Sequence, residues 1–148
     1  EEIPVSSYRI PALLLAPEPR FHGITYDRLC SQIDLMPTAL SLAGIDYTAP
    51  FLGDDLLSLP STVPGRAFVN HNRDVGMLTN DRLVILGLQK KVTVYGRSEP
   101  ASNEFTKIAE EQLTPADGVL IDRTTAAFQA AYRLYESRHY VLEDHGGR

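Results

Sequence analysis

The sequence predicts an α/β chain whose C-terminal part is α+β. Three patterns carry this prediction: an unbroken apolar run at residues 10–16, an apolar helical period at 31–45, and four closely spaced strand patterns between residues 67 and 96. A last helical pattern follows Thr114. We therefore expect one buried strand and one buried helix, then a four-stranded antiparallel sheet packed by a C-terminal helix.

Residues 10–16 predict a strand that is buried on both faces. Their apolar run is continuous, whereas a strand with one solvent face alternates between apolar and polar residues. Pro17 and Pro19 end the run, since proline lacks the N–H that a sheet requires. We expect neighbouring strands on both sides of this segment.

Residues 34–43 predict a short helix that is apolar nearly all round. Its apolar positions form two rows, at 33, 36, 40 and 43 and at 35, 39 and 42, which leave only a narrow polar stripe at Asp34, Thr38 and Ser41. Such a helix is usually surrounded by protein. Asp34 suits a cap at its first turn, and Gly44 suits the left-handed position after its end.

Residues 67–96 predict an antiparallel meander. The four strand patterns lie at 67–71, 75–79, 83–88 and 91–95, and two or three polar residues separate each from the next. Connections this short cannot form parallel crossovers. Thr114, Pro115 and Asp117 signal the start of the last helix, whose small alanine face favours close approach to the sheet. The connector 98–113 is polar, with a short helix expected near 103–111.

Composition narrows the functional classes. A chain of 148 residues with a net charge of −5 fits one ordinary globular unit, and we expect no nucleic-acid partner. Cys30 is the single cysteine, which excludes an internal disulfide and a cysteine zinc cluster. Its apolar neighbours favour a buried small side chain over a nucleophile.

The residue order around the short helix adds a family resemblance. Asp34-Leu35-Met36-Pro37-Thr38, with Gly44 after it, resembles the "D-x-x-P-T" helix of the sulfatase branch of the alkaline phosphatase superfamily. Two flanks agree with this. Tyr8 to Pro17 resembles the "R-x-P" strand before that helix, and Gly53-Asp54-Asp55-Leu56 resembles the "G-x-D-L" loop after it. The segment Phe128 to Tyr135 is most similar to phosphoglycerol transferases of the lipoteichoic acid synthase type.

The resemblance implies the last part of a larger enzyme. Residues 1–66 would be the tail end of the sulfatase-like α/β core, including one strand and helix of a larger sheet, and residues 67–148 a small sheet-and-helix subdomain. The parent would be a metal-dependent, membrane-anchored phosphoglycerol transferase or a sulfatase-like hydrolase. It would use manganese, zinc or calcium, and act at the extracytoplasmic face of the bacterial inner membrane or in the periplasm.

The chemistry of that family has no match in this sequence. Cys30 does not begin the sulfatase nucleophile pattern, and Thr38 belongs to the helix motif. Asp144-His145 repeats the letters of the family's metal pair, but after the last helix instead of before the strand. We therefore expect no catalytic residue, no metal ligand and no cofactor in this chain, and no activity from the chain alone.

His71 and Arg73 are the candidate site residues that remain. They lie in the densest polar cluster, at the end of an expected strand, where pocket rims often occur. A plain hairpin turn is the other interpretation.

Two functional hypotheses remain open at this stage. The chain is the structural C-terminal portion of a parent enzyme, or it is a free-standing, non-catalytic binding or structural module. In the first case its partner is the remainder of the parent catalytic domain. The apolar strand would then lack its neighbours in the isolated chain, which predicts self-association.

Overall fold

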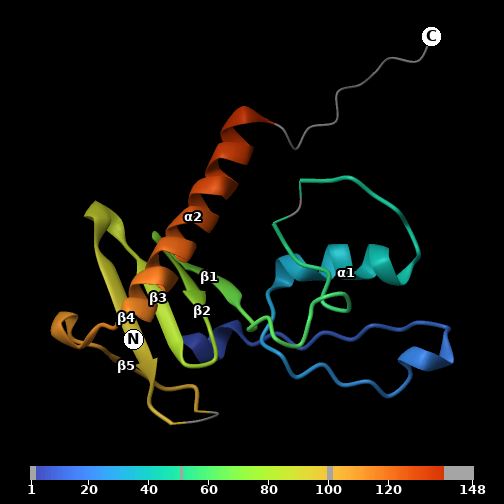
Figure 1. Cartoon of the computed structure of the whole chain (residues 1–148), viewed down its shortest axis with the longest axis horizontal. Helices are drawn as coiled ribbons and strands as arrows, with labels where there is room; N and C mark the ends of the chain where they lie inside the picture. The colour runs from blue at the N-terminus through green and yellow to red at the C-terminus, as the bar shows by residue number, and fades with distance from the viewer. Residues whose placement is uncertain (1–2, 51, 100–101, 139–148) are drawn as a thin grey trace.

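The computed structural model describes residues 3–50, 52–99 and 102–138. The described residues form a five-stranded antiparallel sheet in which each strand pairs with the next along the chain (Figure 1). The strands are β1 (Ala67–His71), β2 (Asp74–Leu78), β3 (Arg82–Leu86), β4 (Val92–Arg97) and β5 (Phe105–Lys107). The α-helices are α1 (Leu35–Leu42) and α2 (Pro115–Ser137); the 3₁₀ turns are η1 (Val5–Tyr8), η2 (Pro19–Phe21), η3 (Gln32–Asp34), η4 (Leu88–Lys90) and η5 (Glu110–Gln112).

The predicted meander is confirmed, and a fifth strand extends it. His71 pairs with Asp74 across a two-residue turn, where Asn72 has a φ of 56°. Asparagine tolerates this left-handed conformation better than most residues do. The short helix expected near 103–111 is wrong for its first half, since 105–107 form β5, which pairs with β4. The sequence signal was weak because only Phe105 of this strand is buried.

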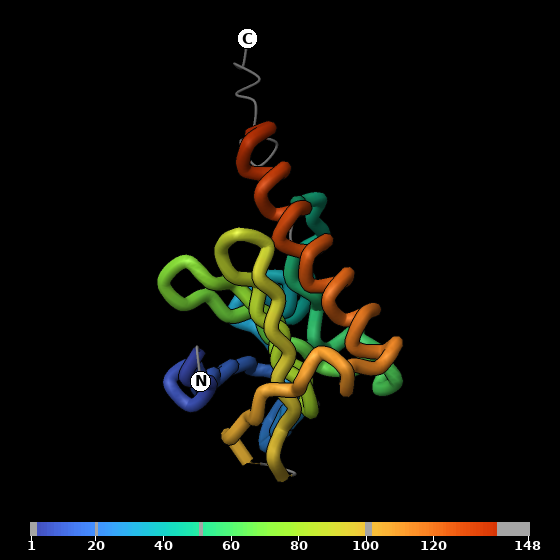
Figure 2. The backbone as a smooth tube through the Cα atoms, turned by 90° about the vertical axis from the view of Figure 1, so that its left-hand side faces the viewer, coloured from blue at the N-terminus to red at the C-terminus, as the bar shows by residue number. Residues whose placement is uncertain are grey.

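Both faces of the sheet are covered by other parts of the chain. One core cluster joins Ile3 and Val5 of the N-terminal segment to alternate side chains of the strands: Val69, Leu78, Leu83, Ile85, Tyr95 and Phe105. Helix α2 covers the other face, where the rings of Phe68 and Phe128 meet with centroids 5.6 Å apart. Figure 2 shows α2 and the N-terminal segment on opposite sides of the sheet. The prediction that the last helix covers the sheet is confirmed; the division of the chain at residue 66 stays a prediction.

Helix α2 begins where the sequence indicated. The Thr114 hydroxyl accepts a hydrogen bond from the Asp117 N–H, and the Asp117 carboxylate accepts one from the Thr114 N–H at 2.8 Å. Arg82 Nε of β3 donates to the same carboxylate at 2.7 Å and so attaches the helix start to the sheet. The hydrogen bond from the Thr114 hydroxyl, with further bonds and charge from Arg82, lowers the pKa of Asp117 although burial opposes this.

The predicted strand at 10–16 is not formed. These residues have no regular secondary structure, and Leu13 and Leu15 are 81% and 89% exposed. A strand requires a hydrogen-bonded neighbour, and no strand of the described residues pairs with this segment. The expectation of burial on both faces is therefore wrong for the chain in this structure.

Helix α1 is present at the predicted place, but its most buried side chains are not the expected ones. Asp34 and Thr38 from the polar stripe are 2% and 1% exposed, while Met36 from an apolar row is 57% exposed. The cause is a set of polar contacts with the loop at 54–56. Of the apolar rows, the leucines are only partly buried and the other residues are exposed, so the helix is not surrounded by protein as expected.

Candidate functional site

The buried face of α1 is part of a polar junction formed by Ser31, Asp34, Thr38, Asp54 and Arg66. Asp34 is its centre. The carboxylate of Asp34 accepts one hydrogen bond from the Ser31 N–H at 2.7 Å and another from the Asp54 N–H at 2.9 Å. The first bond completes a capping box at the start of η3, and the second joins the helix start to a loop 20 residues away.

Thr38 adds a second bond between the helix and the same loop. Its hydroxyl donates to the Asp34 carbonyl oxygen at 2.6 Å and accepts from the Leu56 N–H at 3.0 Å. A threonine in a helix can satisfy both roles because its hydroxyl carries one donor and two acceptor sites. The "D-x-x-P-T" and "G-x-D-L" segments thus bind each other directly.

Arg66 closes the junction from the start of β1. One of its terminal nitrogens, Nη2, donates to Asp54 Oδ2 at 2.6 Å, and the other, Nη1, lies 3.6 Å from Asp34 Oδ1. Its guanidinium also lies over the Phe68 ring, 4.7 Å from the centroid. One arginine therefore balances much of the negative charge of two partly or fully buried carboxylates.

Glycine is required where the segments cross. A Cβ atom on Gly53 would lie 2.1 Å from the Ile33 carbonyl oxygen, and one on Gly65 would lie 2.3 Å from the Leu29 carbonyl oxygen. Both contacts involve backbone atoms, which cannot move aside as a side chain can. The close approach of these three segments explains why a glycine begins the "G-x-D-L" loop.

The polar groups of the junction are engaged with one another. Each carboxylate in it already accepts hydrogen bonds from N–H groups or from Arg66, and the described residues contain no group of three His, Cys, Asp or Glu side chains that could hold a metal ion. Burial would raise the pKa of Asp55, but hydrogen bonds from Ser58, Ser41 and two backbone N–H groups together outweigh it and lower the pKa. Asp55 therefore stabilises the turn at 55–58 as a carboxylate.

Cys30 lies next to this junction and is partly buried. Burial, with the nearby charge of Asp34, raises the pKa of its thiol. A thiol that stays protonated is a poor nucleophile.

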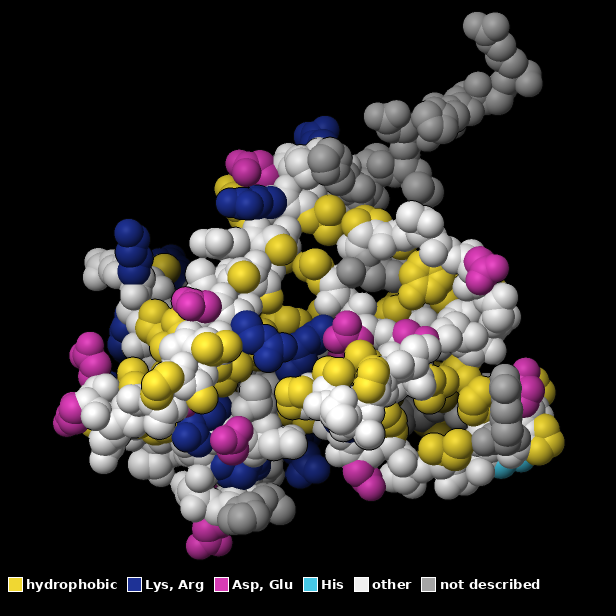
Figure 3. Space-filling view, viewed as in Figure 1, with side chains coloured by type: hydrophobic (Ala, Val, Ile, Leu, Met, Phe, Trp, Pro, Cys, Tyr) yellow, Lys and Arg dark blue, Asp and Glu magenta, His cyan; other side chains and the backbone are white. Residues whose placement is uncertain are grey.

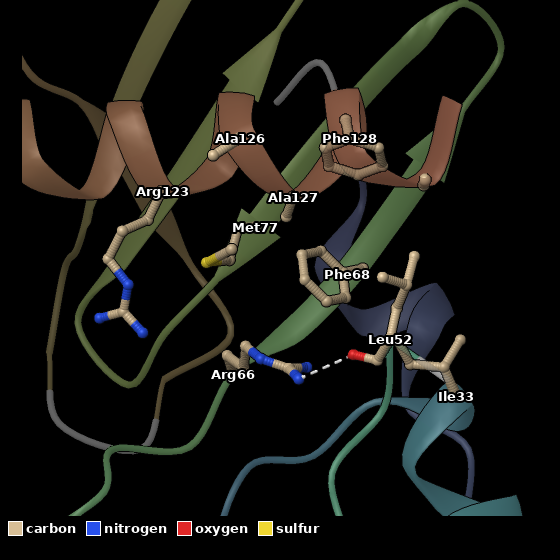
Figure 4. Close-up of a pocket in the computed structure, with 10 residues that line it drawn as sticks. Ile33, Leu52, Arg66, Phe68, Met77, Arg123, Ala126, Ala127 and Phe128 are labelled. Carbon is tan, nitrogen blue, oxygen red and sulfur yellow. Dashed lines mark hydrogen bonds between the residues drawn. The ribbon is translucent and has the colours of Figure 1, made fainter. Parts of the chain in front are cut away.

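A concave hollow of about 420 Å³ lies between α2 and the junction. Figure 4 shows α2, the sheet and the α1 segment around it, with two arginines on one side. Its lining is Ile33, Leu52, Arg66, Phe68, Met77, Arg123, Ala126, Ala127, Phe128 and Ala131. In the space-filling view hydrophobic side chains surround the opening, and Lys or Arg side chains border it (Figure 3).

The sequence-predicted candidates lie away from this hollow. His71 ends β1 with its Nδ1 2.9 Å from the Tyr8 hydroxyl, and Arg73 is an exposed residue of the β1–β2 turn. The side chain that His71 contacts is Tyr8, which is not one of the predicted site residues. Their role at a substrate rim stays a prediction. Asp144 and His145 lie outside the described residues.

The sequence did not predict that two arginines line one side of the hollow. Arg66 and Arg123 are far apart along the chain, and nothing in the local pattern links them. The one available signal was the alanine face of α2, which indicated close packing but not an opening beside it.

The fold and junction define a class: a sheet-and-helix unit joined to a helix–loop segment by buried polar contacts. No protein-family model matches the chain. Among solved structures, the chain is similar to the crystal structure of a protein in the alkaline phosphatase superfamily from Vibrio parahaemolyticus, with 30% sequence identity and a TM-score of 0.67. The similarity covers 79% of this chain and 27% of that protein. This finding supports the alkaline phosphatase superfamily, as the motifs predicted.

Proposed function

We propose that this chain is the C-terminal portion of a metal-dependent enzyme of the alkaline phosphatase superfamily, and that it acts as a scaffold for the catalytic part. The observation that carries the proposal is the similarity to the Vibrio protein, which includes most of this chain and a minor part of that protein. The Asp34 junction adds support, because it explains in physical terms why both resembled motifs occur together.

The proposed parent is a membrane-anchored phosphoglycerol transferase of the lipoteichoic acid synthase type or a sulfatase-like hydrolase. The similarity between the segment 128–135 and the transferases favours the first reaction. The parent would act at the extracytoplasmic face of the inner membrane or in the periplasm. Among the described residues, no helix is long and apolar enough to cross a membrane.

The residues described here do not fit a catalytic metal. Asp34 and Asp54 are occupied by N–H donors and by Arg66, and hard divalent cations require several unengaged oxygen ligands. We therefore assign manganese, zinc or calcium, and the nucleophile, to the remainder of the parent domain. In that arrangement Asp34 and Thr38 hold the helix and loop that support the domain.

A comparison of this chain with a longer parent tests the proposal. Both would be incubated with manganese or zinc and either bis(p-nitrophenyl) phosphate or p-nitrophenyl sulfate. We expect metal-dependent turnover by the parent and none by the 148 residues alone.

Two outcomes would contradict this expectation. Turnover by the chain alone that is lost in His145→Ala would place a metal site in this chain. A parent that neither binds metal nor turns over either ester would contradict the proposed enzyme and favour a non-catalytic binding or structural role.

A further inference from the structure

The hollow beside α2 has the lining of a small-molecule site. Its interior is formed by aromatic, aliphatic and methionine side chains, and its volume of about 420 Å³ falls within the range of roughly 300–1,000 Å³ that is usual for such sites. Phe68 and Phe128 meet edge to face at its inner side, and Met77 is almost fully buried there. Methionine adapts its shape to different apolar partners.

Positive charge lies along one side of this hollow. Arg66 is largely neutralised by Asp54, at 2.6 Å, and by Asp34, at 3.6 Å. Arg123 is exposed on α2 and forms no hydrogen bond or ion pair with any other described residue. A second, smaller hollow adjoins this side, and its lining adds Arg28 to the same two arginines and two aspartates. The lining of this second hollow thus holds three guanidinium groups and two carboxylates, which gives it a net positive charge.

We propose that the hollow binds a small amphipathic anion, with its apolar body between α2 and the β1–β2 face and its carboxylate on Arg123. A medium-chain fatty carboxylate has this chemistry. The apolar lining would bury the chain, and a guanidinium can accept a carboxylate in a bidentate pair. The inference does not depend on the proposed function.

Binding of octanoate tests the proposal, with octanol as the uncharged probe of equal chain length. We expect saturable calorimetric binding of octanoate, and about fivefold weaker binding of octanol, as the loss of one partly exposed ion pair implies. The chain has two methionines, so ¹³C-methyl labelling reports the location. The Met77 signal should shift with octanoate, and the Met36 signal from the outer face of α1 should not.

Paired variants of α2 separate this site from general apolar adsorption. Ala127→Leu fills the hollow and should abolish binding, while Ala130→Leu, on an exposed position outside the lining, should retain it. Arg123→Gln should reduce octanoate affinity to that of octanol, and Arg133→Gln should leave both affinities unchanged. Equal binding to Ala127→Leu and wild type, a shift of Met36 instead of Met77, or no saturable binding would overturn the proposal.

Discussion

Helix α1 and strand β3 both contribute almost fully buried side chains, but the buried groups differ in kind. In β3 they are Leu83, Val84 and Ile85, which pack in the apolar interior of the sheet unit. In the α1 segment they are Asp34 and Thr38, which hydrogen-bond to the loop at 54–56. The sheet unit is thus held mainly by apolar burial, and the α1 segment by directional polar contacts.

The two regions also differ in how much apolar surface they expose. The sheet is covered on one face by α2 and on the other by Ile3 and Val5. The segment from 10 to 57 instead exposes many large apolar side chains, among them Leu13, Leu15 and Met36. Exposed apolar side chains that gather into one patch usually mark an interaction site. The segment is therefore held by internal hydrogen bonds while its outer apolar side chains remain exposed.

The largest expected effect concerns that uncovered face. We expect the chain to self-associate through residues 10–16, because exposed apolar side chains and unpaired backbone groups favour pairing with another chain. Leu15→Lys should shift sedimentation toward the monomer. Leu88→Lys alters another exposed leucine, 57% exposed against 89% for Leu15, that lies beyond β3, and should sediment like wild type. A wild-type chain that stays monomeric at high concentration would contradict this expectation.

The second effect compares the same substitution in the two regions. Leu83→Ala removes a side chain that is 1% exposed, and core Leu→Ala changes cost about 2–5 kcal/mol of unfolding free energy. Leu13→Ala changes an exposed side chain, for which about 0.5 kcal/mol or less is expected. Urea denaturation at a concentration where the chain is monomeric measures both. Equal losses would show that residues 10–16 contribute to the stability of the monomer.

Sequence alone predicted the elements whose signals are local. The start of α2 was correct because Thr114, Pro115 and Asp117 specify a helix start within four residues. The meander was correct because two- and three-residue turns allow no other topology. Strand β5 was missed because it is short and largely exposed.

Long-range contacts decided what the sequence could not predict. Periodicity places the apolar rows of α1 inside, but hydrogen bonds with the Asp54 and Leu56 N–H groups hold Asp34 and Thr38 of the polar stripe in buried positions. The hollow depends on Arg66 and Arg123, which only the folded chain brings together. The family motifs identified the helix and the loop, and the structure explains them by their contact.

The smallest expected effect tests whether the two regions open separately. Thr38→Val keeps the shape of the side chain but removes the oxygen that the Leu56 N–H requires. An unsatisfied buried N–H costs about 1–3 kcal/mol. Since the bond joins only the loop to α1, the loss should appear as local opening, with faster hydrogen exchange at Leu56 by about fivefold or more. Exchange within β3 should stay unchanged, as should exchange at Leu56 in Thr48→Val, which alters an exposed threonine. If β3 exchanged faster as well, the polar junction and the sheet would form one cooperative unit, and the contrast between apolar and polar stabilisation would not divide the molecule into two parts.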